Sequence, residues 1–222
     1  MDIEVTESGL HAAASTPRER LGRRALLGAG AGGVALSLLP FLSSRANASA
    51  TTDGSSTTTS TTIPPQRPTD ADVTVLGFAQ QVELSATALY DEAIALGGWS
   101  DVQGAVVAAI REAHQAYAQS LSGLLGRKAP GVMSQPLFDS LRSDFSGSAD
   151  GVLAAAYNLE SALVATHLDV LAKVQGTDAA ALVASIVTNE ARHGTVLADL
   201  AGKSDEATLL VLEESAALTA KG

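Results

Sequence analysis

The chain has 222 residues, with 14 Lys and Arg against 24 Asp and Glu, four histidines and no cysteine. The lack of cysteine excludes disulfides, thiolate metal sites, cysteine nucleophiles and a lipid anchor attached through cysteine. The acidic balance argues against a nucleic-acid partner, because binding phosphates requires a basic face. Apolar residues make up 46% of the chain and aromatic residues only 4%. This Ala- and Leu-rich composition favours helices over sheets.

The first segment, residues 1–48, contains the regions of an export signal in their usual order. Several arginines precede an uncharged, mildly apolar stretch at residues 25–42, and small residues at 46–48 offer a cleavage site. The arginine pair at residues 23–24 resembles the start of a twin-arginine (Tat) signal. The alternative is a membrane anchor, since about 18 residues is the lower limit for a span. Four glycines and the cleavage site favour removal. We therefore expect Tat export to an extracytoplasmic location, with membrane contact only through an uncleaved signal.

A low-complexity segment follows at residues 49–69. It is dominated by Ser and Thr and ends in three prolines. Such a segment cannot bury enough apolar area to fold, so it is predicted to be a flexible, exposed tether. The remaining chain is predicted to form a helical bundle at residues 70–202 and a C-terminal helix and tail at residues 203–222.

From residue 70 onward the apolar residues recur with the period of an α-helix. Ser100 and Gln103 form a capping box that starts the second helix, and Thr177 is predicted to cap the fourth. The stripe predicted to face the core from the fourth helix comprises Leu182, Ile186, Asn189, His193, Val196 and Leu200. The four long helices are expected at about residues 71–96, 100–126, 149–174 and 177–202, and a short fifth helix at about residues 204–218.

The lengths of the connections predict how the helices are arranged. The first and second helices, like the third and fourth, are joined by only a few residues, so each pair should form an antiparallel hairpin. Residues 126–148 are numerous enough to run the length of a helix. The expected fold is thus all-α, with two antiparallel hairpins joined by one long crossover in a four-helix bundle.

Six ionisable side chains lie on the apolar stripes of these helices. A single core histidine is usually structural, but isolated buried carboxylates cost several kcal/mol each unless they are paired or bind a metal. Their gathering in a bundle otherwise lined by Ala, Leu and Val therefore favours a metal site or a buried ion network. The six residues are Glu83, His114, Glu160, His167, Glu190 and His193.

This pattern resembles the ferritin-like superfamily of di-iron carboxylate proteins over residues 71–202. The family places a Glu, an E-x-x-H motif, a Glu and a second E-x-x-H motif on four successive helices. The resemblance implies that Tyr90, one heptad after the first Glu, lies near the metals. It also implies a set of metal ligands in this chain, namely Glu83, His114, Glu160, Glu190 and His193.

One position departs from the family pattern: Arg111 stands where a carboxylate should bridge the two metals. Three carboxylates and one arginine carry a formal charge that balances one divalent ion rather than two. Alternatively, Arg111 forks into two of the carboxylates and leaves a metal-free ion network. His167 lies two turns from Glu160, about 10 Å along the helix axis. We therefore expect it to support the ligands or the packing rather than to share a metal with Glu160.

Two functions stay open at this point. The first is an exported protein that binds iron or manganese, one ion rather than two, through Glu and His. The resemblance would add oxidase or peroxide-reducing activity. The second is a degenerate, metal-free ferritin-like bundle that serves as a structural or binding module in the cell envelope.

Overall fold

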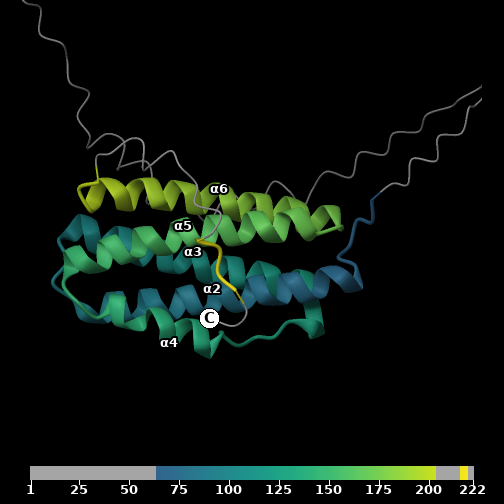
Figure 1. Cartoon of the computed structure of the whole chain (residues 1–222), viewed down its shortest axis with the longest axis horizontal. Coiled ribbons are helices and arrows are strands. Elements are labelled where there is room, and N and C mark those ends of the chain that lie inside the picture. Colours follow the sequence, from purple (N-terminus) through teal and green to yellow (C-terminus); the bar gives the residue numbers. More distant parts are fainter. Residues whose placement is uncertain (1–63, 204–215, 220–222) are drawn as a thin grey trace, which may run out of the picture. The chain divides into compact units, whose positions relative to one another are not determined.

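A computed structural model describes residues 64–203 and 216–219 (Figure 1). The predicted signal, most of the predicted tether and most of the predicted fifth helix lie outside the described residues. Within these residues, all regular secondary structure is helical, which confirms the all-α fold. Among them, no helix combines the length and the apolar character that crossing a membrane requires.

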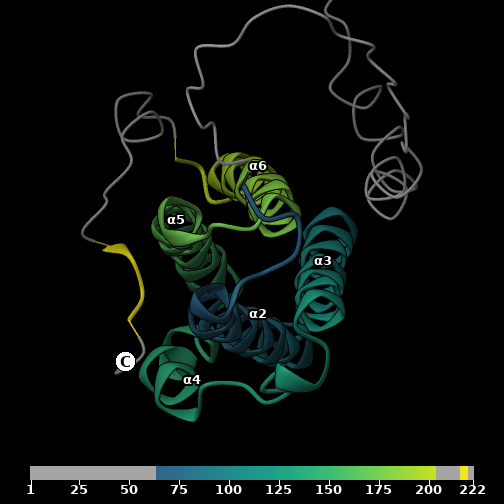
Figure 2. The same cartoon turned by 90° about the vertical axis from the view of Figure 1, so that its right-hand side faces the viewer.

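Four long helices form two hairpins that pack side by side (Figures 1 and 2). Within each hairpin the helices contact each other closely, and the hairpins meet more through their first helices than through their second ones. The first hairpin comprises α2 (Asp70–Leu96) and α3 (Asp101–Leu125), and the second comprises α5 (Ala149–Lys173) and α6 (Thr177–Leu200).

The crossover between the hairpins contains short helices that the sequence did not predict. These are η2 (Gly126–Lys128), α4 (Gln135–Leu141) and η3 (Arg142–Phe145). α4 packs along the outside of α2 (Figure 2). It buries Leu137 and Phe138, and η3 buries Phe145. The crossover therefore adds apolar cover to one side of the bundle.

The helix starts are fixed by side-chain caps in three of the four long helices. The predicted capping box of Ser100 and Gln103 is confirmed at the start of α3. A second box joins Thr69 to Asp72 at the start of α2, and the Ser148 hydroxyl accepts from a backbone N–H in the first turn of α5. These contacts satisfy N–H groups that have no partner inside the helix.

The start of α6 corrects the prediction that Thr177 caps this helix. Its N-cap is Gly176, which has no side chain to accept a hydrogen bond. The N–H groups of Thr177 and Asp178 instead donate to the carbonyl oxygens of Pro65 and Gln66, at 3.0 Å each. Residues that the sequence assigned to the flexible tether therefore form part of the fold.

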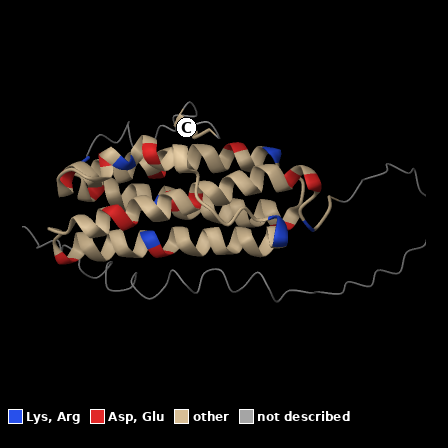
Figure 3. Ribbon diagram, turned by 90° about the horizontal axis from the view of Figure 1, so that it is seen from below, with Lys and Arg blue, Asp and Glu red and all other residues tan. Residues whose placement is uncertain are grey.

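The bundle interior has two apolar clusters, one toward each end, with the ionisable residues at middle height between them. Charged residues are spaced along the helices with long uncharged stretches between them (Figure 3). The stripe predicted for the fourth helix is partly wrong, because Val196 is 40% exposed and Asn189 is only half-buried. α6 is turned by about one residue, and its buried face comprises Ala179, Val183, Ile186, Glu190, Gly194, Leu197 and Ala198.

Candidate metal centre

All six ionisable residues of the stripes come together at the middle of the bundle. Three are carboxylates, three are histidines, and each of the four long helices supplies at least one. Five of them are fully buried: Glu83, His114, Glu160, His167 and Glu190. The side chain of His193 is 14% exposed. This histidine therefore marks the side on which solvent comes nearest to the cluster.

His114 links the two hairpins through both of its ring nitrogens. Nδ1 lies 2.8 Å from Oε2 of Glu83 on α2, and Nε2 lies 2.9 Å from Oε1 of Glu160 on α5. The ring of Tyr90 stacks on the imidazole, with the ring centroids 5.3 Å apart. His114 is thus fixed in both position and ring orientation.

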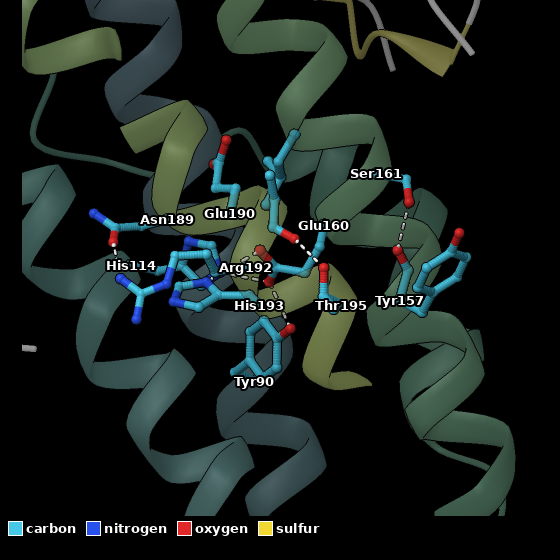
Figure 4. Close-up of polar contacts among 12 residues, drawn as sticks. Tyr90, His114, Tyr157, Glu160, Ser161, Asn189, Glu190, Arg192, His193 and Thr195 are labelled. Atoms are coloured by element: carbon cyan, nitrogen blue, oxygen red, sulfur yellow. Dashed lines mark hydrogen bonds and ion pairs between the residues drawn. The ribbon is translucent and has the colours of Figure 1, made fainter. Parts of the chain in front are cut away.

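Glu160 is the most heavily partnered carboxylate of the cluster (Figure 4). Besides His114, it accepts a 2.6 Å hydrogen bond from the Tyr90 hydroxyl, and its Oε2 lies 3.3 Å from Nδ1 of His193. Tyr90 therefore contacts two of the residues that the resemblance implies as ligands, Glu160 and His114. Both oxygens of Glu160 therefore have protein partners.

His167 is paired with the other two carboxylates of the cluster. Its Nδ1 lies 3.0 Å from Oε1 of Glu190, and its Nε2 lies 3.3 Å from Oε1 of Glu83. The sequence placed His167 two turns away from Glu160 and therefore in a supporting role. The spacing of Glu160 and His167 along α5 does not reveal which carboxylates on the neighbouring helices lie at the height of His167.

Arg111 is not part of the cluster, which corrects both roles predicted for it. Its Nε donates to Oδ1 of Asp91 at 2.8 Å, and its Nη1 donates to Gln115. The side chain is 26% exposed. The long side chain starts at the flank of α3 and turns outward to the surface acid on α2. Arg111 therefore neither forks into the buried carboxylates nor neutralises them at contact distance.

The buried charges shift one another's pKa values. Burial alone would lower the pKa of His114, but the charges of Glu160 and Glu83 outweigh it and raise this pKa well above its usual range. In the same way, burial opposes but Glu190 and Glu83 together raise the pKa of His167 to about 9. Burial tends to raise the pKa of Glu160, but the contacts with His114 and His193 lower it below its usual range.

Glu190 behaves differently from Glu160. Burial raises the pKa of Glu190 to about 7, and the opposing effect of His167 offsets this only in part. Protonated His114 and His167 together balance two of the three carboxylate charges. When no other cation is bound, these imidazolium charges keep the carboxylates from being uncompensated buried charges, which are strongly destabilising.

Several buried polar atoms in the cluster lack a hydrogen bond within the described part of the chain. They are Oε1 of Glu83, Nε2 of His167, Oε1 of Glu190 and the hydroxyl of Tyr117. An unsatisfied buried polar atom is costly, so each such group calls for an explanation. Three of the four lie around the contact of His167 with Glu83 and Glu190.

Two overlapping sets of donor atoms could hold a cation. One comprises Glu83, His114 and Glu190 and the other His114, Glu160 and His193, and the donor atoms of each set lie within 4.8 Å of one another. Carboxylate and imidazole donors without thiolate suit iron, manganese or zinc. The chemistry of the donor set and the unsatisfied oxygens of Glu83 and Glu190 therefore fit a metal ion.

Sequence reasoning missed two features of this site. The first is the contact of His167 with Glu83 and Glu190, although its place on the core stripe was a signal. The second is Tyr117, whose ring lies edge-on to His114 and stacks on His193. Tyr117 follows His114 by one helical turn, but tyrosines on such stripes are common in ordinary cores.

The structure is a four-helix bundle of two hairpins and one crossover, and each of the four helices directs at least one Glu or His inward. These features define a ferritin-like carboxylate protein. A family model for the ferritin-like domain matches residues 71–203. The chain belongs to this family. The comparisons with curated proteins and with solved structures give no match.

Proposed function

We propose that this chain is an exported ferritin-like protein that holds one divalent metal ion, iron or manganese, in the interior of the bundle. The ligands would come from the five residues that match the family motif, namely Glu83, His114, Glu160, Glu190 and His193. The observation that carries the proposal is that Glu83 and Glu190 share one donor set with His114, and that each has a buried oxygen with no hydrogen bond to any described residue.

The count of one ion follows from His114. It belongs to both donor sets, yet a neutral imidazole has only one nitrogen with a free lone pair. His114 can therefore complete one set at a time. The carboxylate that the family places at position 111 is also missing, so the second ion would lack a bridging ligand.

The export signal predicted from the sequence would give the protein an extracytoplasmic role, and the Tat route carries proteins that have already folded, often with a cofactor inserted. When bound, an iron ion would supply one-electron chemistry toward oxygen or peroxide. The chain's own residues bury the site and orient the donors. The partly exposed His193 marks the side from which a small molecule would approach.

Metal analysis of natively exported protein, followed by reconstitution with Fe²⁺ or Mn²⁺, tests the proposal. We expect one ion per chain, and strongly reduced binding in Glu190→Gln. The matched control is Glu112→Gln, which changes an exposed Glu on α3 and should bind like the parent. Binding far below one ion per chain after reconstitution would contradict the proposal.

A metal-free bundle is the second candidate, and the histidine contacts favour it. Both ring nitrogens of His114 already lie at hydrogen-bond distance from carboxylates. Under this alternative the protein would be a structural or binding module of the cell envelope. Glu190→Gln would then change stability without any effect on metal content.

A further inference from the structure

The two ring nitrogens of His167 lie in different surroundings. Nδ1 lies 3.1 Å from the carbonyl oxygen of Leu163, one turn earlier on α5, and 3.1 Å from Oε2 of Glu190. Nε2 lies 3.3 Å from Oε1 of Glu83. Within the described residues, neither Nε2 nor that oxygen makes a hydrogen bond.

The carbonyl of Leu163 can only accept a hydrogen bond, so Nδ1 carries the proton and donates it. In the neutral ring the lone pair is then on Nε2. This is the arrangement by which proteins orient a metal-binding histidine: one nitrogen donates to a carbonyl or carboxylate, and the other faces the ion. The lone pair of Nε2 would face an oxygen of Glu83 that also carries lone pairs. Two acceptors at this distance repel each other, so in the absence of a metal a proton on Nε2 lies between them, as in the imidazolium described above, and a bound ion would take the place of that proton.

Glu160, the corresponding carboxylate on the second hairpin, does not need a cation beside its Oε1. Oε1 of Glu160 accepts from the Tyr90 hydroxyl and contacts His114. Tyr90 holds the place on α2 that His167 holds on α5, seven residues after the buried Glu of its own helix. One side of the cluster is thus closed by a hydroxyl donor, and the other presents a nitrogen and an oxygen that make no hydrogen bond in the described part of the chain.

We propose that His167 is a further ligand of the metal ion, through Nε2, and that the ion occupies the side of the cluster formed by Glu83, His114 and Glu190. This inference rests on the proposed function. His167 would supply the donor that Arg111 does not, with an imidazole in place of a carboxylate. Because imidazole suits iron better than manganese, the exchange shifts the preference of the site toward Fe²⁺.

Cobalt substitution tests this assignment, with Co²⁺ as an air-stable probe for Fe²⁺. In protein labelled with ¹⁵N-histidine, the imidazoles that bind Co²⁺ give strongly shifted proton and nitrogen resonances. We expect two shifted histidines, and His167→Gln should remove one of them. The affinity for Co²⁺ should fall by more than about 100-fold, beyond the range for residues that only orient a ligand. Unchanged resonances and affinity in His167→Gln would overturn the inference while leaving the proposed function intact.

Two further variants keep the test decisive if His167→Gln folds poorly. His193→Gln changes the half-buried member of the cluster and should retain both shifted histidines, since His193 belongs to the other donor set. A single remaining shifted histidine in that variant would overturn the inference. Thr166→Val is the matched control, because Thr166 is a buried neighbour on α5 whose hydroxyl donates to Ala162 outside the cluster. If the unaltered protein does not bind Co²⁺, Fe²⁺ or Mn²⁺, both the inference and the proposed function fail.

Discussion

Tyr90 and His167 hold equivalent places in the two hairpins, and each contacts the buried carboxylate of the opposite hairpin. The Tyr90 hydroxyl on α2 lies 2.6 Å from Glu160 on α5, and His167 Nε2 on α5 lies 3.3 Å from Glu83 on α2. The two contacts are related by an approximate twofold arrangement of the hairpins. They differ in chemistry, because a neutral phenol donates a proton whereas an imidazole can give a lone pair.

The Tyr90 hydroxyl should contribute measurably to stability. Tyr90→Phe removes the donor to the fully buried Glu160, and hydrogen bonds to charged groups contribute about 1.5–3 kcal/mol each. We expect a loss in that range in the free energy of unfolding, measured by urea denaturation.

Tyr117→Phe is the control for this change. Tyr117 is also buried beside His114, but its hydroxyl makes no hydrogen bond within the described residues. Removing that hydroxyl should leave stability unchanged or raise it slightly. Equal losses in the two variants would show that the contact with Glu160 is not what stabilises the fold at Tyr90.

Arg111 should matter little to the metal site. Its guanidinium pairs with the exposed Asp91, and exposed pairs contribute about 0.2–1 kcal/mol. Arg111→Ala should therefore leave metal content and affinity unchanged, as measured by calorimetry and metal analysis. A clear gain in affinity would mean that the charge of Arg111 reaches the cluster.

Arg111→Glu tests the same position by reversing its charge. It restores the carboxylate that the family pattern places three residues before His114. A glutamate is shorter than an arginine and can turn inward from the flank of α3. It would supply a donor to the set that His114 does not complete, so we expect metal capacity to rise toward two ions per chain. An unchanged capacity would show that residue 111 does not reach the site.

Asp72 should make the stability of the bundle sensitive to acid. Its carboxylate accepts from the N–H groups of Thr69, Gln175 and Gly176, at 2.7, 2.7 and 3.0 Å. Burial alone would raise the pKa of Asp72, but these hydrogen bonds outweigh it and lower the pKa below 3.8. Its contribution is therefore complete above the unfolded-state pKa and is lost as the pH falls through the lower pKa of the folded state.

Asp72→Asn tests this contribution, because the amide places a donor against backbone N–H groups. We expect a loss of roughly 2 kcal/mol near pH 7, with the difference from the parent shrinking below about pH 4. Urea denaturation across this pH range measures it. Asp70→Asn, in the same helical turn as Asp72, breaks only an exposed ion pair with Lys128 and should cost much less stability than Asp72→Asn. A loss for Asp72→Asn that is constant with pH would contradict the role of the charge.

Gly176 should not tolerate a side chain. A Cβ at this position would lie 2.8 Å from the carbonyl oxygen of Arg67 and 3.0 Å from Cα of Pro68, which are backbone atoms. Gly176→Ala should therefore destabilise the fold by about 1–3 kcal/mol through overpacking, and it should speed proteolysis near residue 67. Gly123→Ala, in the exposed part of α3 with open space around it, should instead raise the melting temperature.

Helix positions were predictable because the apolar period persists over many turns. The long helices lie within a few residues of the expected bounds, and the Ser100 capping box is confirmed. α4 was missed because it has only seven residues, too few to establish a period. The turn of α6 was assigned about one residue off, because Ala and Gly on its buried face carry little hydropathic signal.

The sequence predicted which residues form the candidate site but not which of them contact each other. Six ionisable residues on apolar stripes were expected to meet, and the contacts among them show that they do. Which histidine meets which carboxylate depends on the relative height of antiparallel helices, and spacing along one helix does not determine it. This is why the two carboxylates that His167 contacts could not be named from the sequence. Arg111 was misplaced because a long side chain at a flank position can turn either way.

The carbonyl groups of Pro65 and Gln66 change where this domain begins. They accept the first two N–H groups of α6, the helix that carries Glu190 and His193. A fragment starting at Ala71, where the family match starts, would leave those N–H groups without their acceptors. A unit that keeps both of these hydrogen bonds therefore begins no later than residue 65, and a boundary drawn from family similarity alone cuts into it.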